Sequence, residues 1–550
     1  METEKNSEVI NKKNKKYEKL ELNKLISYPK QSNNNLKENF SLNETEQECF
    51  TIILNILKKY NLTSTICRVA GGWVRDKLLG KESDDIDIAL SDIKGSKLAQ
   101  LINEELYPGK DKVGIIQQNA EKGKHLETAT IKICKIWIDF VNLRSEEENV
   151  IGTPLKDAER RDLSINSLFY NINEKKVEDW TNKGLSDLKN GIISTPIEAK
   201  ITFKDDPLRI LRMLRFAVKY KFRISDNINN CIEENIEEYR NNYNNTISVE
   251  RIEKELFKIL NMKYSSFAIA YLYEFNLLDT ILQPQKYDSS NKYSFENIFL
   301  STANIYILGE YLLQSKKLFN TEINSENFNK IDFGLLLLTI NFRNMQVKFG
   351  KENITINKLI LRETFKTSND YIKENQIMNE NIDDLMTFVN KNNYERLTIG
   401  KILRKIHYKN IIKILLALIC YEYIEKIGLK ELICDINDNI LQPIIDKYKF
   451  FYDYIVKENM LHIDDMKPLF TGQDIIKMLD IKPGKIIGKL LELLIEEQIK
   501  DQNFTKEMAN DFLMKKKDEI GADINDQSDN SNISSVQKKN KKKNKKEKEK

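Results

Sequence analysis

Several residue types and sequence features are rare or absent in this chain of 550 residues. Only three His residues are present (His125, His407 and His462), which nearly excludes chemistry built on a histidine cluster. The six Cys residues are scattered without a CxxC pair, which argues against a zinc site and favours a reducing compartment. No apolar run reaches the ~18 residues of a membrane span. The N-terminus resembles neither a secretory signal nor a good transit peptide. We therefore expect no membrane association and an intracellular location: cytoplasm, nucleus, mitochondrion or another organelle.

The sequence also lacks a bulk charge that would indicate nucleic-acid binding. Its formal net charge is +4, but residues 538–550 hold nine Lys and two Glu, so residues 1–537 together carry −3. Any surface for RNA or nucleotides must therefore come from local clusters. The Lys-rich end itself suits weak, salt-sensitive RNA binding, a nuclear address or a solubilising terminus, and the sequence leaves these open.

Changes in composition along the chain predict its organisation. The first part shows a helix at 46–60, a strand at 64–69, a Gly-Gly turn, a short helix, a strand at 86–89 and strand composition over 131–143. After residue 203, apolar residues recur at i, i+3 and i+4 to about residue 515, and glycine is sparse, which predicts helices. We expect an α+β protein with these parts: a mobile polar extension (1–45), a mixed-sheet head (46–200), a helical neck (201–262), a helical body (263–400), a helical tail (401–524) and a disordered Lys-rich end (525–550).

A glycine pair in the head suggests phosphate binding. Gly71 and Gly72 lie between a predicted strand and a predicted helix, where paired glycines let backbone N–H groups approach a phosphate closely. Arg75, one turn into that helix, can add a phosphate contact. An ordinary tight turn also contains such a pair, so the motif alone leaves both interpretations open.

An acidic pair follows on the strand at 86–89. Asp85 and Asp87 point to the same face because they are two residues apart, while Ile86 and Ile88 are expected to face the core. Two carboxylates this close repel each other unless a cation lies between them, and their hard oxygens suit Mg²⁺. Asp139 is either a third carboxylate at this site or a strand-edge residue. Together with the glycines, the acidic pair describes a site for a nucleoside triphosphate and two metal ions.

These motifs, with others that follow in the chain, resemble a known family. Gly71-Gly72-x-Val74-Arg75-Asp76 with Asp85-x-Asp87 resembles the signature of polymerase-β-type nucleotidyltransferases, and more narrowly of class II tRNA nucleotidyltransferases (CCA-adding enzymes) and bacterial poly(A) polymerases. Later segments resemble the family's Arg-Arg-Asp motif, its nucleotide-selecting Glu-Asp-x-x-Arg motif with Asp at the first position, and the helix that buttresses the site: Glu159-Arg160-Arg161-Asp162 with Asn166, Asp205-Asp206-Pro207-Leu208-Arg209, and residues 248–256. Residues 124–130 and 471–484 resemble the eukaryotic branch.

The resemblance implies a function and a set of site residues. It implies a polymerase-β-like head, an all-α neck, body and tail, and an enzyme that adds CMP, CMP and AMP to the 3′ end of tRNA without a template. CTP and ATP would be the substrates, pyrophosphate would be released, and Asp85 and Asp87 would hold two Mg²⁺ ions. The tail would grip the tRNA elbow. The nucleotide-binding residues would be Gly71, Gly72, Arg75, Asp76, Arg160, Arg161, Asp162, Asn166, Asp206, Arg209, Arg212 and Arg215.

The pair Asp206 and Arg209 also has a physical interpretation of its own. Residues three apart share a helix face, and a carboxylate beside a guanidinium can complement the Watson–Crick edges of cytosine and adenine. Guanine and uracil lack the amine that such a carboxylate would accept from. Arg212 and Arg215 would extend a basic stripe for phosphates or bases. An intrahelical Asp–Arg pair with solvated arginines is the plain alternative.

Two alternative functions stay open. One is a related polymerase that adds only part of CCA or a poly(A) tail, although the eukaryotic-type segment 124–130 weighs against tail addition. The other is a non-catalytic tRNA-binding protein on the same fold, against which Asp85 and Asp87 argue. A phosphohydrolase activity is not expected, because His462 and Asp464 have no companion His motif. Gly472, Gly484 and Gly488 suit either helix caps or contacts with an RNA backbone. The sequence gives no oligomeric state.

Overall fold

The computed structural model describes ten segments of the chain: residues 35–37, 40–110, 112–116, 127–145, 150–290, 292–295, 297–315, 328–391, 394–428 and 430–517. The chain forms two compact units. The first comprises residues 1–320, 329–375 and 420–437, and the second comprises residues 321–328, 376–419 and 438–550. In the described segments, no helix has both the length and the apolarity needed to span a membrane.

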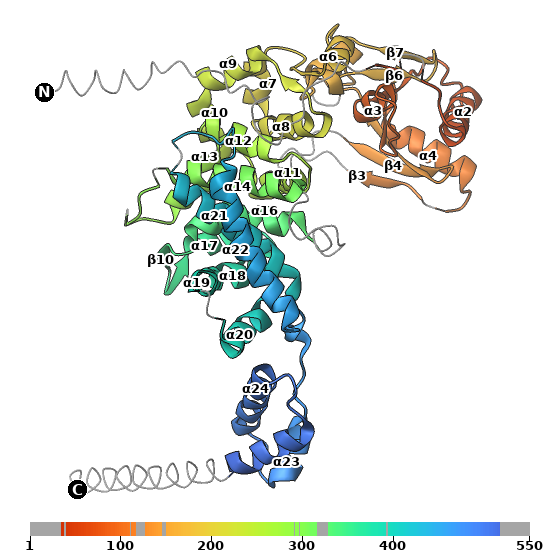
Figure 1. The fold of residues 1–550 in the computed structure, drawn as a ribbon. Helices are drawn as coiled ribbons and strands as arrows, with labels where there is room; N and C mark the ends of the chain where they lie inside the picture. Colours follow the sequence, from red (N-terminus) through yellow and green to blue (C-terminus); the bar gives the residue numbers. More distant parts are fainter. Residues whose placement is uncertain are drawn as a thin grey trace, which may run out of the picture. The chain divides into compact units, whose positions relative to one another are not determined.

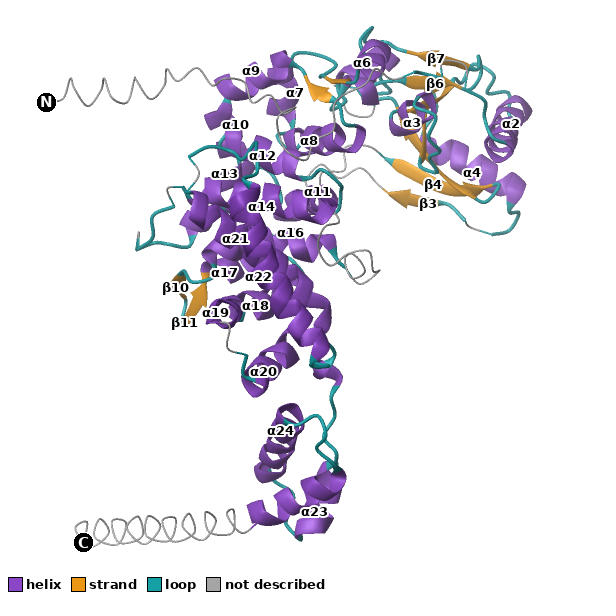
Figure 2. Ribbon diagram, in the orientation of Figure 1, coloured by secondary structure: helices purple, strands orange, loops and turns teal. Residues whose placement is uncertain are grey.

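A mixed sheet forms the head, within the first unit (Figures 1 and 2). Its strand order is β3-β4-β5-β2-β1-β6-β7. The pair β2–β5 is parallel and the other neighbouring pairs are antiparallel. The strands are β1 (Cys67–Ala70), β2 (Ile86–Leu90), β3 (Gly114–Ile116), β4 (Thr128–Ile133), β5 (Ile136–Asn142), β6 (Phe169–Asn171) and β7 (Lys176–Glu178). The predicted α+β class and the mixed-sheet head are confirmed.

Residues 131–143, expected as strand, contain a hairpin of β4 and β5. The turn residues Cys134 and Lys135 both have positive φ, 47° and 73°. This is the backbone form of a tight two-residue hairpin. Because neither residue is Gly, Asn or Asp, the sequence carries no turn signal there. The Sγ of Cys49 in α2 (Glu44–Lys59) lies 3.2 Å from the carbonyl oxygen of Ile133 and ties the hairpin to that helix.

The two faces of the sheet have different environments. On one face Ile131, Ile138 and Phe140 are fully buried where α4 (Gly95–Leu106) packs on β4 and β5. Alternation places Asp87 and Asp139 on the opposite face. That face is covered at one end by α5 (Pro154–Glu159), through an apolar cluster of Ala70, Ala89, Leu143, Ala158 and Phe169. The part of the face beyond this cover, which we call the open face, carries both carboxylates.

Helices dominate the rest of the chain. The remaining head helices are α3 (Gly72–Leu78), η3 (Ser164–Asn166) and α6 (Gly184–Asn190). Those that follow in the first unit up to residue 364 are α7 (Ala199–Asp205), α8 (Arg209–Tyr220), α9 (Asp226–Glu234), α10 (Ile236–Asn245), α11 (Val249–Leu260), α12 (Ser266–Glu274), α13 (Leu278–Leu282), η4 (Pro284–Lys286), α14 (Ile298–Ser315), α16 (Lys330–Thr339), η5 (Ile340–Phe342), α17 (Ile356–Leu359) and the π-helical η6 (Ile360–Thr364). Helix α8 packs against α7, α11 and α12.

Later helices complete the described chain. They are α18 (Asn369–Glu380), α19 (Ile382–Lys391), α20 (Arg396–Ile406), α21 (Tyr408–Ile427), α22 (Asp438–Lys457), η7 (Ile463–Asp465), α23 (Gly472–Leu479) and α24 (Lys485–Lys500). Residues 506–517 are also helical. In the second unit, α24 packs on α20 and α23.

Two short strand pairs add to the helical part. Strands β8 (Ile192–Ile193) and β9 (Arg223–Ile224) pair in parallel, and β10 (Gln346–Phe349) with β11 (Glu352–Thr355) forms a hairpin. Gly350, at φ 64°, makes the hairpin turn possible. The six-part division stays a prediction, since the two units are a coarser partition. The extension up to residue 34, residues 38–39 and the end at 525–550 lie outside the described residues.

Candidate active site

Three carboxylates gather at the open face. Asp87 and Asp139 are register partners on the parallel strands β2 and β5, and the exposed Asp85 directly precedes β2. Ile86 and Ile88 are 2% and 0% exposed, so their predicted core orientation is confirmed. Burial and the negative charges of Asp85 and Asp139 raise the pKa of Asp87 to about 6. The pKa of Asp87 is lowered in turn by the positive charges of Arg161 and Arg144.

The chemistry of this carboxylate group fits a divalent cation. The raised pKa shows that burial and the neighbouring carboxylates together disfavour the charged form of Asp87 more than the nearby arginines favour it. Thr130 Oγ1 donates to Asp139 Oδ1 at 2.5 Å and fixes its orientation. Within the described segments no three His, Cys, Asp or Glu side chains form a metal cluster by themselves. A cation at Asp85 and Asp87 would therefore share its coordination with substrate phosphates and water, as Mg²⁺ usually does.

The glycine pair forms a turn whose geometry requires Gly71. Gly71 has φ 74° and ψ −115°, and its N–H donates to the carbonyl of Leu168 at 2.9 Å. A Cβ at Gly71 would lie 2.6 Å from Nη1 of Arg161 and 3.2 Å from the backbone oxygen of Asn166. Gly71 therefore permits close packing of the Arg161 side chain against the turn, whereas Gly72 has a negative φ and no close contact.

Arg75 and Asp76 join the head to helix α8. Arg75 is 4% exposed, and its guanidinium lies against the rings of Phe216 and Tyr220 of α8, 4.9 and 4.8 Å from their centroids. Its Nε donates to Asp76 at 3.0 Å, and its Nη1 donates to Asn166 Oδ1. Tyr220 also donates to Asp76, at 2.6 Å. The predicted phosphate contact of Arg75 stays a prediction, and it would require the guanidinium to exchange partners.

Asp157 is a site residue that the sequence analysis missed. It is buried, and its Oδ2 accepts from Nε and Nη2 of Arg161 at 3.0 and 2.8 Å. The backbone N–H of Arg144 donates to the other carboxylate oxygen at 3.1 Å. Burial favours the neutral acid, but the charges of Arg161 and Arg144 outweigh it and lower the pKa of Asp157. The i, i+4 spacing of Asp157 and Arg161 is the signal that would have predicted this pair.

The arginines of the predicted basic stripe have carboxylate partners. Arg212 contacts Asp162 at 2.7 Å, and Arg215 contacts Glu255 of α11 at 2.6 Å. Asp162 also accepts from Asn166 Nδ2 at 3.0 Å. Burial opposes ionisation of Asp162, but its interactions with Arg212 and Asn166 hold its pKa at about 2. The alternative of solvated arginines is therefore wrong for these two side chains, which connect the head to α8 and α11.

The expectation that Asp206 and Arg209 share a helix face is wrong, because the two residues do not lie in one helix. Helix α7 ends at Asp205, Asp206 is extended, and α8 begins at Arg209. Pro207 explains the break, because the residue before a proline disfavours helical geometry.

The two side chains have separate partners. Arg209 pairs with Asp205 at 2.7 Å, and Asp206 accepts from Arg251 of α11 at 2.6 Å. Arg209 also donates to the carbonyl oxygen of Arg160 at 2.8 Å. Asp205 stands where the family motif has Glu, and it holds Arg209. No local signal predicts Arg251, which lies 45 residues from Asp206.

The other candidate residues are less informative. The side chain of Arg160 donates to the carbonyl of Ser145 at 2.5 Å, and His125 lies outside the described residues. In the second unit His407 contacts Asp464 at 3.1 Å. Thr471 and Asp474 form a reciprocal capping box just before and within the start of α23 at Gly472, and Gly484 is the N-cap residue of α24, whereas Gly488 lies within α24. The contact of these glycines with an RNA backbone stays a prediction.

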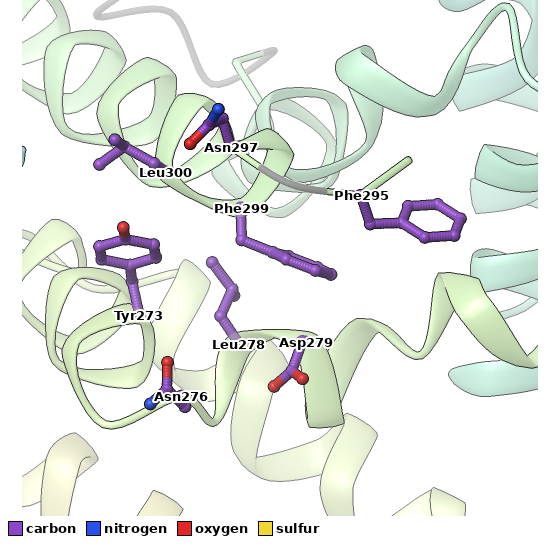
Figure 3. A pocket seen from close by; sticks show the side chains of 8 residues that line it. All are labelled: Tyr273, Asn276, Leu278, Asp279, Phe295, Asn297, Phe299 and Leu300. Carbon is purple, nitrogen blue, oxygen red and sulfur yellow. The ribbon is translucent and has the colours of Figure 1, made fainter. Parts of the chain in front are cut away.

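A pocket in the first unit contains none of these residues (Figure 3). It has a volume of about 230 Å³ and lies between the end of α12, the start of α13 and the start of α14. Its lining includes Leu278, Phe299 and Asp279, and Asp279 is ion-paired with Arg240 at 2.5 Å. The acidic group is therefore neutralised within the protein, and we assign the pocket no role.

Comparisons with known proteins relate the chain to others by sequence and by fold. Residues 67–194 match the family described as the poly A polymerase head domain. The chain is 32% identical over 530 residues to the mitochondrial CCA tRNA nucleotidyltransferase of Candida glabrata, covering 85% of this chain and 95% of the relative.

Two solved structures have a similar fold. The Thermotoga maritima CCA-adding enzyme complexed with tRNA has a TM-score of 0.58 at 20% identity, with 86% of this chain and 96% of that chain covered. A CCA-adding enzyme with CTP has a TM-score of 0.60 at 19% identity, with the same coverage of 86% and 96%. At these identities the similarity concerns the fold.

Proposed function

The chain belongs to the CCA tRNA nucleotidyltransferase family, and on this basis we propose that it adds CMP, CMP and AMP to the 3′ end of tRNA without a nucleic-acid template. CTP and ATP are the proposed substrates, and pyrophosphate is the leaving group. One observation carries the proposal: Asp85, Asp87 and Asp139 lie together on the open face of the sheet. Strand β1, which is the neighbour of β2 in this sheet, leads into the Gly71 turn. A protein that only binds tRNA has no use for unneutralised carboxylates facing an RNA backbone.

Asp85 and Asp87 are the proposed ligands of two Mg²⁺ ions, with Asp139 as the third carboxylate. When bound, such ions activate the 3′-hydroxyl of the tRNA and stabilise the charge of the leaving pyrophosphate. The chain's own residues supply the orientation. Ile86 and Ile88 anchor β2 in the core, and Thr130 holds Asp139. The carboxylates are thus fixed before the substrates bind, which favours nucleotidyl transfer.

The triphosphate is proposed to lie at the turn formed by Gly71 and Gly72, with the Arg161 guanidinium beside it. Arg161 packs against this turn and is held by Asp157, so its position beside the turn is fixed. Arg160, Asp162 and Asn166 belong to the same segment and are the proposed contacts to phosphate and ribose. Arg75, Asp76, Arg212 and Arg215 remain proposed nucleotide-binding residues. The present partners of Arg75, Asp76 and Arg212 indicate that these three also hold the neck against the head, whereas Arg215 pairs with Glu255 within the neck.

Arg209 and Asp206 are proposed to select the base. Asp205 and the carbonyl oxygen of Arg160 fix the guanidinium of Arg209, and Arg251 fixes Asp206. A fixed donor and a fixed acceptor at the base edge can replace a template, because cytosine and adenine both carry an exocyclic amine and a ring acceptor.

The partner and the compartment complete the proposal. The tRNA is proposed to bind through its elbow to the tail helices, which include α23 and α24. We place the protein in an intracellular compartment, and the mitochondrion is the first candidate because the Candida glabrata relative is named as mitochondrial.

The experiment uses tRNAs that lack CCA, CA or the final A, each with a single labelled nucleoside triphosphate. Two CMP additions to the first tRNA, one CMP addition to the second and one AMP addition to the third support the proposal. Incorporation confined to CMP or to AMP would reveal partial addition, and runs of AMP on any 3′ end would reveal a poly(A) polymerase. UTP and GTP serve as negative controls. Binding of all three tRNAs without incorporation would contradict an enzymatic function.

A further inference from the structure

Trp137 on β5 presents an unusually large apolar surface to solvent. It is 58% exposed, whereas Trp73 is 1% exposed and Trp180 is 41% exposed. Its cross-strand partner on β4 is Lys132, whose Nζ lies 5.6 Å from the centroid of the indole ring. Lys132 is itself exposed. The hairpin therefore displays an aromatic ring and a cation side by side, a combination suited to a base and its phosphate.

This pair lies next to the proposed catalytic carboxylates. Trp137 precedes Asp139 by two residues, so both side chains point to the open face, about 7 Å apart along the strand. Ile86 pairs with Ile138 in the parallel register of β2 and β5, and continuing this register by one residue aligns Trp137 with Asp85. The ring and the metal-binding pair thus occupy neighbouring positions on one surface.

The strand order shows which substrate would reach this pair. Strand β1, which leads into the Gly71 turn, lies on one side of β2, while β5 and β4 lie on the other side. Attacking and leaving oxygens are roughly in line across the phosphorus in nucleotidyl transfer. If the triphosphate lies over the glycine turn, the 3′-hydroxyl must come from the side of β5 and β4.

We propose that Trp137 stacks on a base of the single-stranded 3′ end of the acceptor RNA, and that Lys132 binds the neighbouring phosphate. The proposal rests on the proposed function, because that function supplies the RNA strand and the position of the triphosphate. Stacking on an aromatic ring tolerates any base. This suits an acceptor whose terminal base changes with each addition. Trp137 and Lys132 are therefore positioning residues for the RNA and contribute nothing to the choice of nucleotide.

The kinetic test compares Trp137→Ala, Trp137→Phe and Lys132→Ala in the full chain, on tRNA lacking CCA. Loss of a stacked base corresponds to about 1–3 kcal/mol, so Trp137→Ala should raise KM for tRNA by about 5- to 150-fold. KM for CTP should change less than about twofold, and Trp137→Phe should retain most of the tRNA affinity. Lys132→Ala should raise KM for tRNA and weaken its dependence on salt.

The matched control is Trp180→Ala, which removes an exposed tryptophan that follows β7 at the other edge of the sheet. We expect its KM values to equal those of the wild type. Melting temperatures of all variants identify any loss of folding.

A fluorescence test measures the contact without catalysis. In a Trp180→Phe background only Trp73 and Trp137 remain, and Trp73 is buried. An RNA hairpin with a single-stranded 3′ end, titrated in EDTA, should quench the emission of this variant. The same RNA should leave Trp137→Phe/Trp180→Phe unquenched.

The outcomes separate the two proposals. A wild type that adds nucleotides while Trp137→Ala keeps its KM for tRNA, or while both fluorescent variants respond alike, would overturn this inference alone. Such a result would favour a contact between Trp137 and another protein. A wild type that adds no nucleotide but whose fluorescence is quenched only when Trp137 is present would overturn the proposed function and retain the RNA contact.

Discussion

Asp87 and Asp139 lie side by side as register partners on the parallel strands β2 and β5, and both belong to the open face of the sheet. Their positive neighbours, Arg161 and Arg144, are both engaged with the buried Asp157. Burial of Asp87, together with repulsion from Asp85 and Asp139, outweighs the attraction of these arginines, so the pKa of Asp87 is raised to about 6. In the absence of a cation, the ionised Asp87 therefore lowers the free energy of unfolding, and this destabilisation can be measured.

Substituting Asp87 should stabilise the metal-free protein. The folded state binds a proton at Asp87 more tightly than the unfolded state, because the pKa rises from 3.8 to about 6. The ionised carboxylate therefore lowers the free energy of unfolding at any pH above 6, and this loss disappears as the pH falls toward 3.8. Asp87→Asn in EDTA should raise the free energy of unfolding by about 1–3 kcal/mol at pH 7.5. The gain should shrink below pH 6.

Thermal melting with and without Mg²⁺ measures this effect. Added Mg²⁺ should stabilise the wild type and leave Asp87→Asn nearly unchanged. The exposed neighbour Asp84 provides the control, since Asp84→Asn should alter neither value. Equal stability of the wild type and the Asp87→Asn variant in EDTA would show that the ionised Asp87 does not destabilise the folded protein.

Arg209 should depend on Asp205 for nucleotide selection. Asp205→Ala removes the 2.7 Å partner of the guanidinium, which then gains conformational freedom. We expect the preference for CTP over UTP to fall by up to about 5-fold, because Asp205 is half-exposed and such an ion pair contributes about 0.2–1 kcal/mol. Arg209→Ala should reduce the preference further, and Asp205→Glu, which restores the family's residue, should retain it. Single-turnover incorporation of competing triphosphates measures each ratio, and unchanged selectivity in Arg209→Ala would remove this residue from base selection.

Tyr220 should stabilise the connection between head and neck. Tyr220→Phe removes the buried 2.6 Å hydrogen bond to Asp76 and leaves the ring beside Arg75 in place. We expect the free energy of unfolding to fall by about 1.5–3 kcal/mol, the usual range for a hydrogen bond to a charged group. Tyr60→Phe, which removes a hydroxyl from the half-buried partner of Glu105, should cost less. Chemical denaturation followed by tryptophan fluorescence would report both, and equal losses would contradict a special role for Tyr220.

The sequence predicted the features of the site that depend on local spacing. The i, i+2 pair Asp85 and Asp87 with its buried isoleucines follows from strand alternation alone. The mixed-sheet head and the helical remainder follow from apolar periodicity and from the resemblance to a family. The break before Arg209 was also predictable, because Pro207 disfavours helix at Asp206.

Contacts between distant segments could not be predicted in this way. Arg251 reaches Asp206, and Tyr220 reaches Asp76 across 144 positions, so no local pattern relates the partners. The β4–β5 turn escaped prediction for a different reason: Cys134 and Lys135 adopt a conformation usual for Gly, Asn or Asp. The position of Asp139 beside Asp87 depends on the pairing of β2 with β5, which spacing does not determine.

The central claim is that Asp85 and Asp87 hold the metal ions that drive nucleotidyl transfer. The most direct measurement is single-turnover addition of CMP to a tRNA lacking CCA, by Asp85→Ala and Asp87→Ala in saturating Mg²⁺, with tRNA affinity measured in parallel. Loss of several kcal/mol of transition-state stabilisation predicts a rate reduced more than about 1000-fold, with tRNA affinity within about twofold of the wild type and Asp84→Ala fully active. Wild-type rates in Asp85→Ala and Asp87→Ala would contradict the account.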